Sequence, residues 1–134
     1  GAVAAGVPAF VADMFQHWMN EAERGRFQLG LAALDADAQA RFAAGFAACS
    51  VAQQTEAFGA LRGAAKDYRP AGGFGLTARI ADPAAPFFHK VRDLVTLGYF
   101  TSELGITQTL AYVPVPGRFD GDIDVKTWNR QMQL

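Results

Sequence analysis

The fold is decided by residues 26–65, RFQLGLAALDADAQARFAAGFAACSVAQQTEAFGALRGAA, in which alanine fills much of the space between larger apolar side chains. Alanine has the highest helix propensity and allows neighbouring helices to pack closely. A helix is therefore predicted over about residues 26–44, ended by Gly45, and a break at Asp35 is left open. Its apolar positions are Phe27, Leu31, Leu34 and Phe42.

The second half of this stretch carries its own helix start signal. Ser50 and Gln53 have the spacing of a capping box, in which the serine hydroxyl accepts the Gln53 N–H and the Gln53 side chain reaches back. This predicts a further helix that ends at about Ala65. The residues expected to face inward are Val51, Phe58 and Leu61.

A preceding helix is predicted from Pro8 to about Glu23, with Gly25 as its break. Proline is well suited to a first helical turn, where its missing N–H has no partner to lose. The large apolar residues recur at a period of 3.6 and form one stripe. They are Phe10, Val11, Met14, Phe15, Trp18 and Met19.

Residues 67–82, DYRPAGGFGLTARIAD, are predicted to form a loop because proline and glycine interrupt them repeatedly. Asp82 and Pro83 resemble an N-cap followed by a proline at the first helical position. A last helix is expected over about residues 84–98, closed by Gly98 or Gly105. One face of it carries Phe87, Val91, Leu94, Val95 and Gly98.

Beyond Gly105 the pattern predicts an extended tail. Residues 106–113 can be extended, and Pro114 and Pro116 prevent pairing within a central strand. The residues from Gly117 onward are polar with isolated aromatic side chains, which such a segment cannot bury by itself. We expect it to wrap its own domain or to lie on a partner.

Together these patterns predict an all-α protein, a small bundle of about four helices with a long extended C-terminal tail. A length of 134 residues corresponds to a single domain, residues 1–134. Its helical part is expected over about residues 8–104 and its partner-wrapping tail over about residues 105–134.

Charge and hydropathy exclude several function classes. Twelve basic and thirteen acidic residues give a net charge of −1 and a pI near 6.1, so the basic face of a nucleic-acid-binding protein is not expected. No apolar run approaches the roughly 20 residues of a membrane-spanning helix. A single cysteine, Cys49, excludes an internal disulfide framework.

The titratable residues predict no catalytic, cofactor-binding or metal site. His17 and His89 lie far apart in the sequence, and neither belongs to a recognisable set of the three or four converging ligands that zinc needs. Asp120 begins an alternation of aspartates typical of a calcium loop, but Val125 and Gln131 occupy the positions that require glycine and glutamate. Cys49 is interpreted as a small buried apolar residue, and Asp35 and Asp37 would face different ways on a helix.

Residues 87–119, FFHKVRDLVTLGYFTSELGITQTLAYVPVPGRF, contain more aromatic side chains than an alanine-rich core can absorb. Exposed aromatic residues near proline-rich segments are typical of protein–protein interfaces. The alternative is that they only cover the helical bundle. The predicted partner-interface residues are Arg92, Tyr99, Phe100, Tyr112, Pro114, Pro116, Arg118, Phe119 and Trp128.

This stretch resembles the gluconate 2-dehydrogenase subunit 3 family. The matching positions are Phe87, Phe88, Val91, Arg92, Thr96, Leu97, Gly98, Tyr99, Thr101, Ser102, Gly105, Leu110, Tyr112, Pro116 and Gly117. Similar positions in the first half are Gly30, Leu31, Leu34, Asp35, Phe42, Phe46, Gln53 and Gln54. The resemblance covers about residues 8–122. Many family members carry a cysteine shortly after the Pro-Gly turn, where this chain has Asp122.

The resemblance implies a non-catalytic accessory subunit that holds no cofactor itself. Its partner would be a large FAD-containing flavoprotein of the glucose–methanol–choline (GMC) oxidoreductase type, which oxidises a sugar, sugar acid, polyol or glycoside. A c-type cytochrome, with its haem, is a possible third subunit. The family also implies help with folding and twin-arginine export to the periplasm. The sequence shows no twin-arginine motif, so export is expected from the family and from the small apolar start of the chain.

Two other functions are left open by the residues. The first is a free-standing helical module that binds a protein or a small apolar ligand. The second is a small enzyme that uses Cys49 or a histidine, although no activating neighbour can be named from the sequence.

Overall fold

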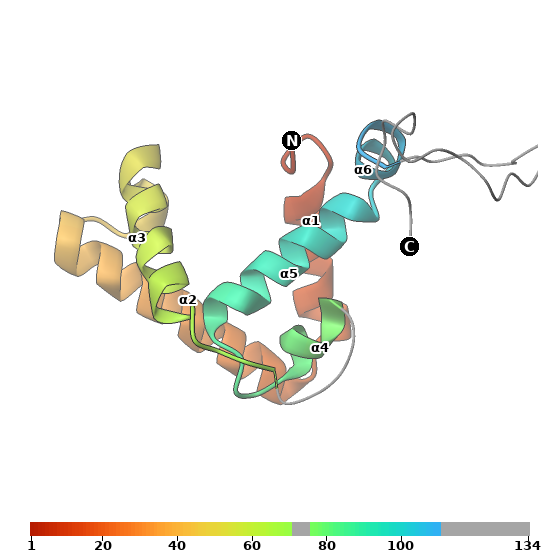
Figure 1. The fold of residues 1–134 in the computed structure, drawn as a ribbon. Helices are drawn as coiled ribbons and strands as arrows, with labels where there is room; N and C mark the ends of the chain where they lie inside the picture. Colours follow the sequence, from red (N-terminus) through yellow and green to blue (C-terminus); the bar gives the residue numbers. More distant parts are fainter. Residues whose placement is uncertain (71–75, 111–134) are drawn as a thin grey trace, which may run out of the picture.

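The computed structural model describes residues 1–70 and 76–110, with side chains from residue 79 onward in the second range. Helices dominate both ranges (Figure 1), as predicted for an all-α protein. The α-helices are α1 (Val7–Asp13), α2 (Glu21–Phe42), α3 (Val51–Ala64), α4 (Leu76–Ala81), α5 (Phe87–Phe100) and α6 (Glu103–Gln108). A π-helical turn at Met14–Trp18 continues α1, and a 3-10 turn at Phe46–Ala48 precedes α3.

Helix α5 runs through the middle of the molecule, with α3 beside its first half and α6 beyond its C-terminal end (Figure 1). Helices α1, α2 and α4 also pack against α5. The core lies where these helices meet, and its buried residues are Met19, Phe27, Ile80 and Leu94. The ring of Phe87 packs edge-on against Phe27 at 5.2 Å between ring centroids. Phe87, the first residue of the aromatic stretch 87–119, therefore covers the helical core. For this residue the structure agrees with the alternative to a protein–protein interface.

Two glycines allow the helices to approach closely. A Cβ atom added to Gly30 of α2 would lie 2.2 Å from the ring of Phe87, and one added to Gly98 of α5 would lie 2.5 Å from the ring of Phe10. Both distances are far below van der Waals contact, so larger residues would force these helices apart.

The predicted first helix is wrong in its boundaries, because the chain breaks at Asn20 rather than at Gly25. The side chain of Asn20 accepts the Glu23 N–H and the Glu23 carboxylate accepts the Asn20 N–H, both at 2.9 Å. This capping box starts α2, and Gly25 lies within that helix. The local signal is present in the sequence directly after Met19, the last residue of the apolar stripe.

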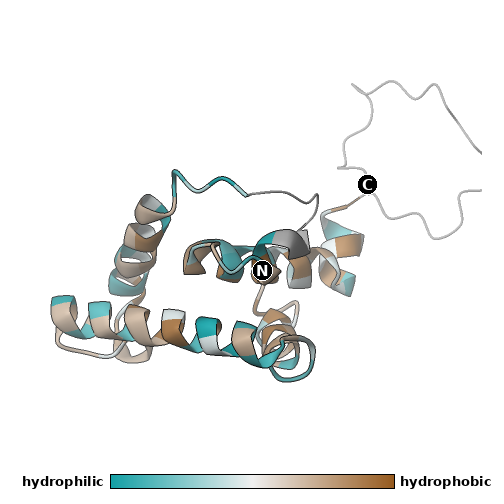
Figure 2. Ribbon diagram, turned by 90° about the horizontal axis from the view of Figure 1, so that it is seen from below, coloured by the Kyte–Doolittle hydropathy of each residue, from teal (hydrophilic) through white to brown (hydrophobic). Residues whose placement is uncertain are grey.

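Helix α2 passes through Asp35 without a break and ends at Phe42, so Gly45 does not end it. Ala43 follows in the left-handed region, with a φ of 54°. The Asp35 carboxylate accepts the Phe46 N–H at 2.7 Å and thereby holds the turn that leads to α3. Hydrophobic and hydrophilic residues are intermixed along α2, the long helix at the bottom of Figure 2.

Helix α3 begins with the capping box predicted at Ser50 and Gln53. Phe58 and Leu61 are half-buried, as expected for inward positions. Val51 is 79% exposed, so its predicted inward orientation is wrong. It occupies the first turn of α3, on the outer face of the helix.

The loop predicted over residues 67–82 contains α4, and the helix expected from residue 84 begins at Phe87. Asp82 does not cap that helix, because its carboxylate accepts the N–H of Ala84 at 2.8 Å and so forms a turn that precedes Phe87. Of the predicted apolar face, Leu94 and Gly98 are buried, whereas Val95 is exposed.

The extended segment predicted from Ile106 is wrong over residues 106–108, which belong to α6. The Ser102 hydroxyl accepts the Gly105 N–H at 3.0 Å and starts this helix. The remainder of the predicted tail, from residue 111, lies outside the described residues. Among the helices of the described residues, none is both long and apolar enough to cross a membrane.

Candidate binding groove

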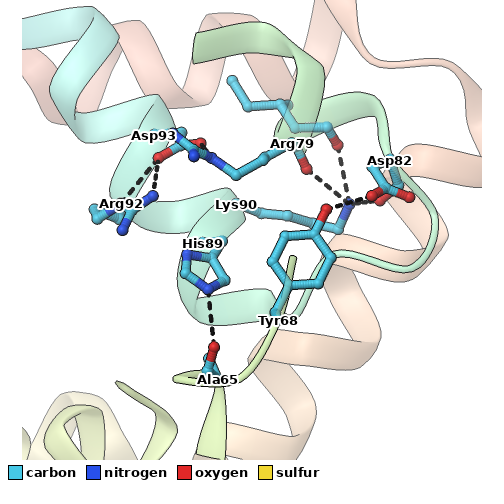
Figure 3. A network of polar contacts seen from close by, with 9 residues as sticks. Ala65, Tyr68, Arg79, Asp82, His89, Lys90, Arg92 and Asp93 are labelled. Atoms are coloured by element: carbon cyan, nitrogen blue, oxygen red, sulfur yellow. Dashed lines mark hydrogen bonds and ion pairs between the residues drawn. The ribbon is translucent and has the colours of Figure 1, made fainter. Parts of the chain in front are cut away.

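A buried lysine on α5 holds the end of α4. The Nζ of Lys90 donates to the carbonyl oxygens of Ile80 at 3.0 Å, Arg79 at 3.4 Å and Asp82 (Figure 3). An ammonium group has three donors, and all three reach carbonyls in the last turn of α4 or directly after it. A cation at a helix C-terminus also interacts favourably with the helix dipole. Burial, with Arg26 nearby, lowers the pKa of Lys90 from its ordinary value of 10.5.

Near this lysine, one buried carboxylate forms ion pairs with two arginines. The carboxylate of Asp93 of α5 accepts hydrogen bonds from Arg79 Nε of α4 at 2.5 Å and from Arg92 Nη2 at 2.9 Å (Figure 3). Buried charges are tolerated only when they are paired and hydrogen-bonded, as here. Because one negative charge faces two positive charges, the cluster keeps a net positive charge.

A second polar contact joins the end of α3 to the same region. The Tyr68 hydroxyl donates to the Asp82 carboxylate, and this hydrogen bond raises the pKa of Tyr68 and lowers the pKa of Asp82. The Nε2 of His89 lies 3.1 Å from the Ala65 carbonyl oxygen, which can only accept, so Nε2 carries the hydrogen (Figure 3). These contacts join the end of α3 to α5 and to Asp82, whereas the Nδ1 of His89 is buried and has no hydrogen-bond partner among the described residues.

An open groove runs along the outer side of α3, where this helix meets the first half of α5. It consists of two adjoining hollows of about 470 and 430 Å³. Gly59 and Arg62 of α3 and Phe88 of α5 line both hollows. The rings of Phe58 and Phe88 lie 5.4 Å apart between centroids and provide an apolar surface.

The α3 side of the groove is a single helical stripe, since its residues recur at intervals of three and four. Its apolar end holds Val51 and Phe58, and its basic end holds Arg62 and Lys66. Within the described part of the chain, the ionisable side chains that line the two hollows are all basic: Arg62, Lys66, His89 and Arg92. The groove can therefore receive a ligand that is apolar at one end and negatively charged at the other.

Three of the predicted interface residues lie in the described structure. Arg92 lines the second hollow, and its guanidinium lies 5.9 Å from the centre of the Phe88 ring. Tyr99 and Phe100 lie at the opposite end of α5, where the Tyr99 hydroxyl is 3.0 Å from the Thr109 hydroxyl. The structure therefore does not bring these three together. The other six predicted residues, Tyr112, Pro114, Pro116, Arg118, Phe119 and Trp128, lie outside the described residues.

Sequence reasoning missed both the groove and the polar network. The spacing of Arg62 and Lys66 indicates one face of a helix, but nothing in that segment shows that α5 lies beside it. Lys90 and Asp93 stand among the apolar residues of α5, and charged residues in such positions are a signal of buried, paired groups.

The remaining candidates from the sequence have ordinary structural positions. Cys49 is buried, as predicted, and its thiol lies 3.7 Å from the Ala44 carbonyl oxygen. His17 is exposed. Over residues 1–70 and 76–110, no group of three or more His, Cys, Asp or Glu side chains is arranged to hold a metal ion.

A family model described as gluconate 2-dehydrogenase subunit 3 matches residues 1–117, which confirms the resemblance found in the sequence. No match is found among curated proteins or solved structures.

Proposed function

The chain belongs to the gluconate 2-dehydrogenase subunit 3 family, and on that basis we propose that it is a non-catalytic accessory subunit of a dehydrogenase complex. The family match over residues 1–117 of the 134-residue chain carries this proposal. The family description names a subunit of a dehydrogenase, so the chain is expected to act in a complex with other subunits.

The partner that we propose is a large FAD-containing flavoprotein of the GMC type. This subunit would hold the FAD and oxidise a sugar, sugar acid, polyol or glycoside. A c-type cytochrome would accept the electrons in complexes that contain a third subunit. We further propose that the accessory chain stabilises the flavoprotein, assists its folding and export, and acts in the periplasm.

Two features of the structure support a role in binding a partner. The buried ionisable side chains Lys90 and Asp93 make hydrogen bonds and ion pairs that join α4 to α5 and so hold the fold together. By contrast, the groove between α3 and α5 presents apolar and basic side chains to the outside. Such a surface can bind a partner without any catalytic group of its own.

Co-expression with the flavoprotein encoded beside this chain tests the proposal. The complex is purified through a tag on this chain, and its native mass and flavin absorption are measured. We expect a yellow complex of the large subunit with this chain, and a large subunit that is insoluble when expressed alone. A colourless 14.3 kDa monomer, together with a flavoprotein that folds well without it, would refute the proposal and favour a free-standing binding module.

A further inference from the structure

We propose that the groove between α3 and α5 is the docking site for an acidic segment of the catalytic partner subunit. The carboxylates of that segment would face Arg62, Lys66 and Arg92, and an apolar side chain of it would pack on Phe58 and Phe88. This inference rests on the proposed function, because it assigns a surface and a ligand chemistry to the same partner.

The charge of the groove selects the ligand. Among the described residues, its lining carries the basic side chains Arg62, Lys66 and Arg92 and no carboxylate, and neither Arg62 nor Lys66 forms an ion pair there. Arg92 does contact Asp93, but that carboxylate is shared with Arg79 and cannot neutralise both guanidiniums. Complementary charge across an interface speeds association and excludes wrong partners. An acidic segment satisfies this surface, whereas a basic one is repelled by it.

The apolar end of the groove fixes the direction of the segment. Val51 is exposed and Phe58 and Phe88 are half-buried, so an apolar side chain placed there would remove their surfaces from water. The stripe from Val51 to Lys66 is about 22 Å long at 1.5 Å per residue. A segment of about seven extended residues covers that length. We therefore expect an apolar residue near one end of the segment and acidic residues near the other.

The glycines of α3 leave room for close approach. A Cβ atom added to Gly59 or Gly63 would meet no atom within 4 Å, in contrast to Gly30 and Gly98, which face other helices. Glycine in a helix interior is less stable than alanine. Because the space beside Gly59 is open, no contact within the described residues explains why glycine stands at this position. A segment docked on this stripe would lie directly over these two positions.

The test measures binding of the tagged full chain to the purified flavoprotein. We expect the double variant Arg62→Gln/Lys66→Gln to bind about tenfold more weakly or worse at low ionic strength, with a reduced dependence on salt. The matched control is Arg41→Gln on α2, which removes an exposed arginine outside the groove and should leave the dissociation constant within about twofold of the original.

Replacing a glycine of α3 by alanine gives an independent test, in which stability should increase while binding to the flavoprotein becomes weaker. Gly59→Ala should raise the melting temperature of the chain and weaken its binding to the flavoprotein. Gly25→Ala on α2 is the control, because an added Cβ there also meets no atom within 4 Å. It should raise the melting temperature without any change in binding.

A carbodiimide, which joins an amine to a carboxylate without a spacer, identifies the contact directly. We expect a cross-link from Lys66 to an aspartate or glutamate of the flavoprotein, located by mass spectrometry. Lys66→Arg keeps the charge but removes the amine, so this variant should bind normally and lose the cross-link.

The outcomes separate the two proposals. If the unaltered chain does not bind the flavoprotein, the proposed function fails and this inference fails with it. If the chain binds but Arg62→Gln/Lys66→Gln binds equally well, only the docking site is refuted. A dimer of the chain that this double variant dissociates would assign the groove to a second copy. A lower melting temperature of the variant with unchanged binding would assign it to the chain's own remaining residues.

Discussion

Replacing Asp93 by asparagine tests whether the buried ion-pair cluster holds α4 against α5. Asp93 is 1% exposed and contacts Arg79 of α4 and Arg92 of α5 at 2.5 and 2.9 Å. Asparagine has nearly the same shape but no negative charge, so the two guanidiniums would lose their shared counter-ion. A helix as short as α4, with six residues, is not stable by itself and depends on such contacts.

The magnitude follows from the exposure of the two arginines. Removal of one partner from a fully buried ion pair destabilises a protein by about 3–5 kcal/mol. The side chains of Arg79 and Arg92 are 29% and 41% exposed, so water can solvate both guanidiniums once the carboxylate is gone. We therefore expect the free energy of unfolding to fall by about 2–3 kcal/mol. For a chain of this length, that corresponds to a decrease in Tm of about 8–12 °C.

The assay is thermal and urea unfolding of the full chain, followed by far-UV circular dichroism. The matched control is Asp37→Asn, which breaks a 2.9 Å pair with Arg41 on the surface of α2, where both side chains are nearly 40% exposed. That change should reduce stability by no more than about 0.5 kcal/mol. Equal decreases in Tm for the two variants would refute the reasoning, because burial would then make no difference to the value of the ion pair.

Three further predictions concern packing, pH and capping. Gly98→Ala should lower the free energy of unfolding by about 1–3 kcal/mol in urea titrations, because the new Cβ would collide with the Phe10 ring, and an unchanged midpoint would contradict the close approach. The pKa of Asp82 is lowered in the folded state, so its ionised carboxylate stabilises the fold at pH values above the ordinary aspartate pKa. This stabilisation is lost as pH falls through the folded-state pKa. Tyr68→Phe should therefore weaken the loss of stability as pH falls below about 4, and identical profiles in urea titrations would rule this out. Asn20→Ala should lower the free energy of unfolding by about 1 kcal/mol, because it removes the side chain that caps α2. An unchanged calorimetric stability would show that the capping box at the start of α2 is dispensable.

Local signals in the sequence predicted the elements that are stabilised within a few residues of themselves. The capping box at Ser50 gave the start of α3, and alanine content gave the helical class. The same kind of signal at Asn20 would have placed the start of α2 correctly. The predicted break lies at Gly25 instead, although Asn20 directly follows the last apolar residue of the stripe, Met19.

The features that the sequence failed to predict depend on distant residues. Helix α4 follows a glycine-rich segment, and the described contacts that hold it come from Lys90 and Asp93 of α5. Similarly, Arg92 was predicted from its residue type to bind a partner, but the structure shows that it also neutralises a buried carboxylate. The exposure of Val51 likewise follows from where α5 packs, since α3 alone does not reveal which of its faces is covered.

By itself, the sequence determined the helical class, the capped start of α3 and the family of the protein. These depend on hydrogen bonds closed within about four residues and on motifs that are read directly from the chain. Only the tertiary structure decided that Lys90 and Asp93 are buried, that α4 forms, and that α3 and α5 together line an open basic groove. The physical reason is that burial and ion pairing are set by side chains 10 or more residues apart in the sequence, whose meeting depends on how all the helices pack.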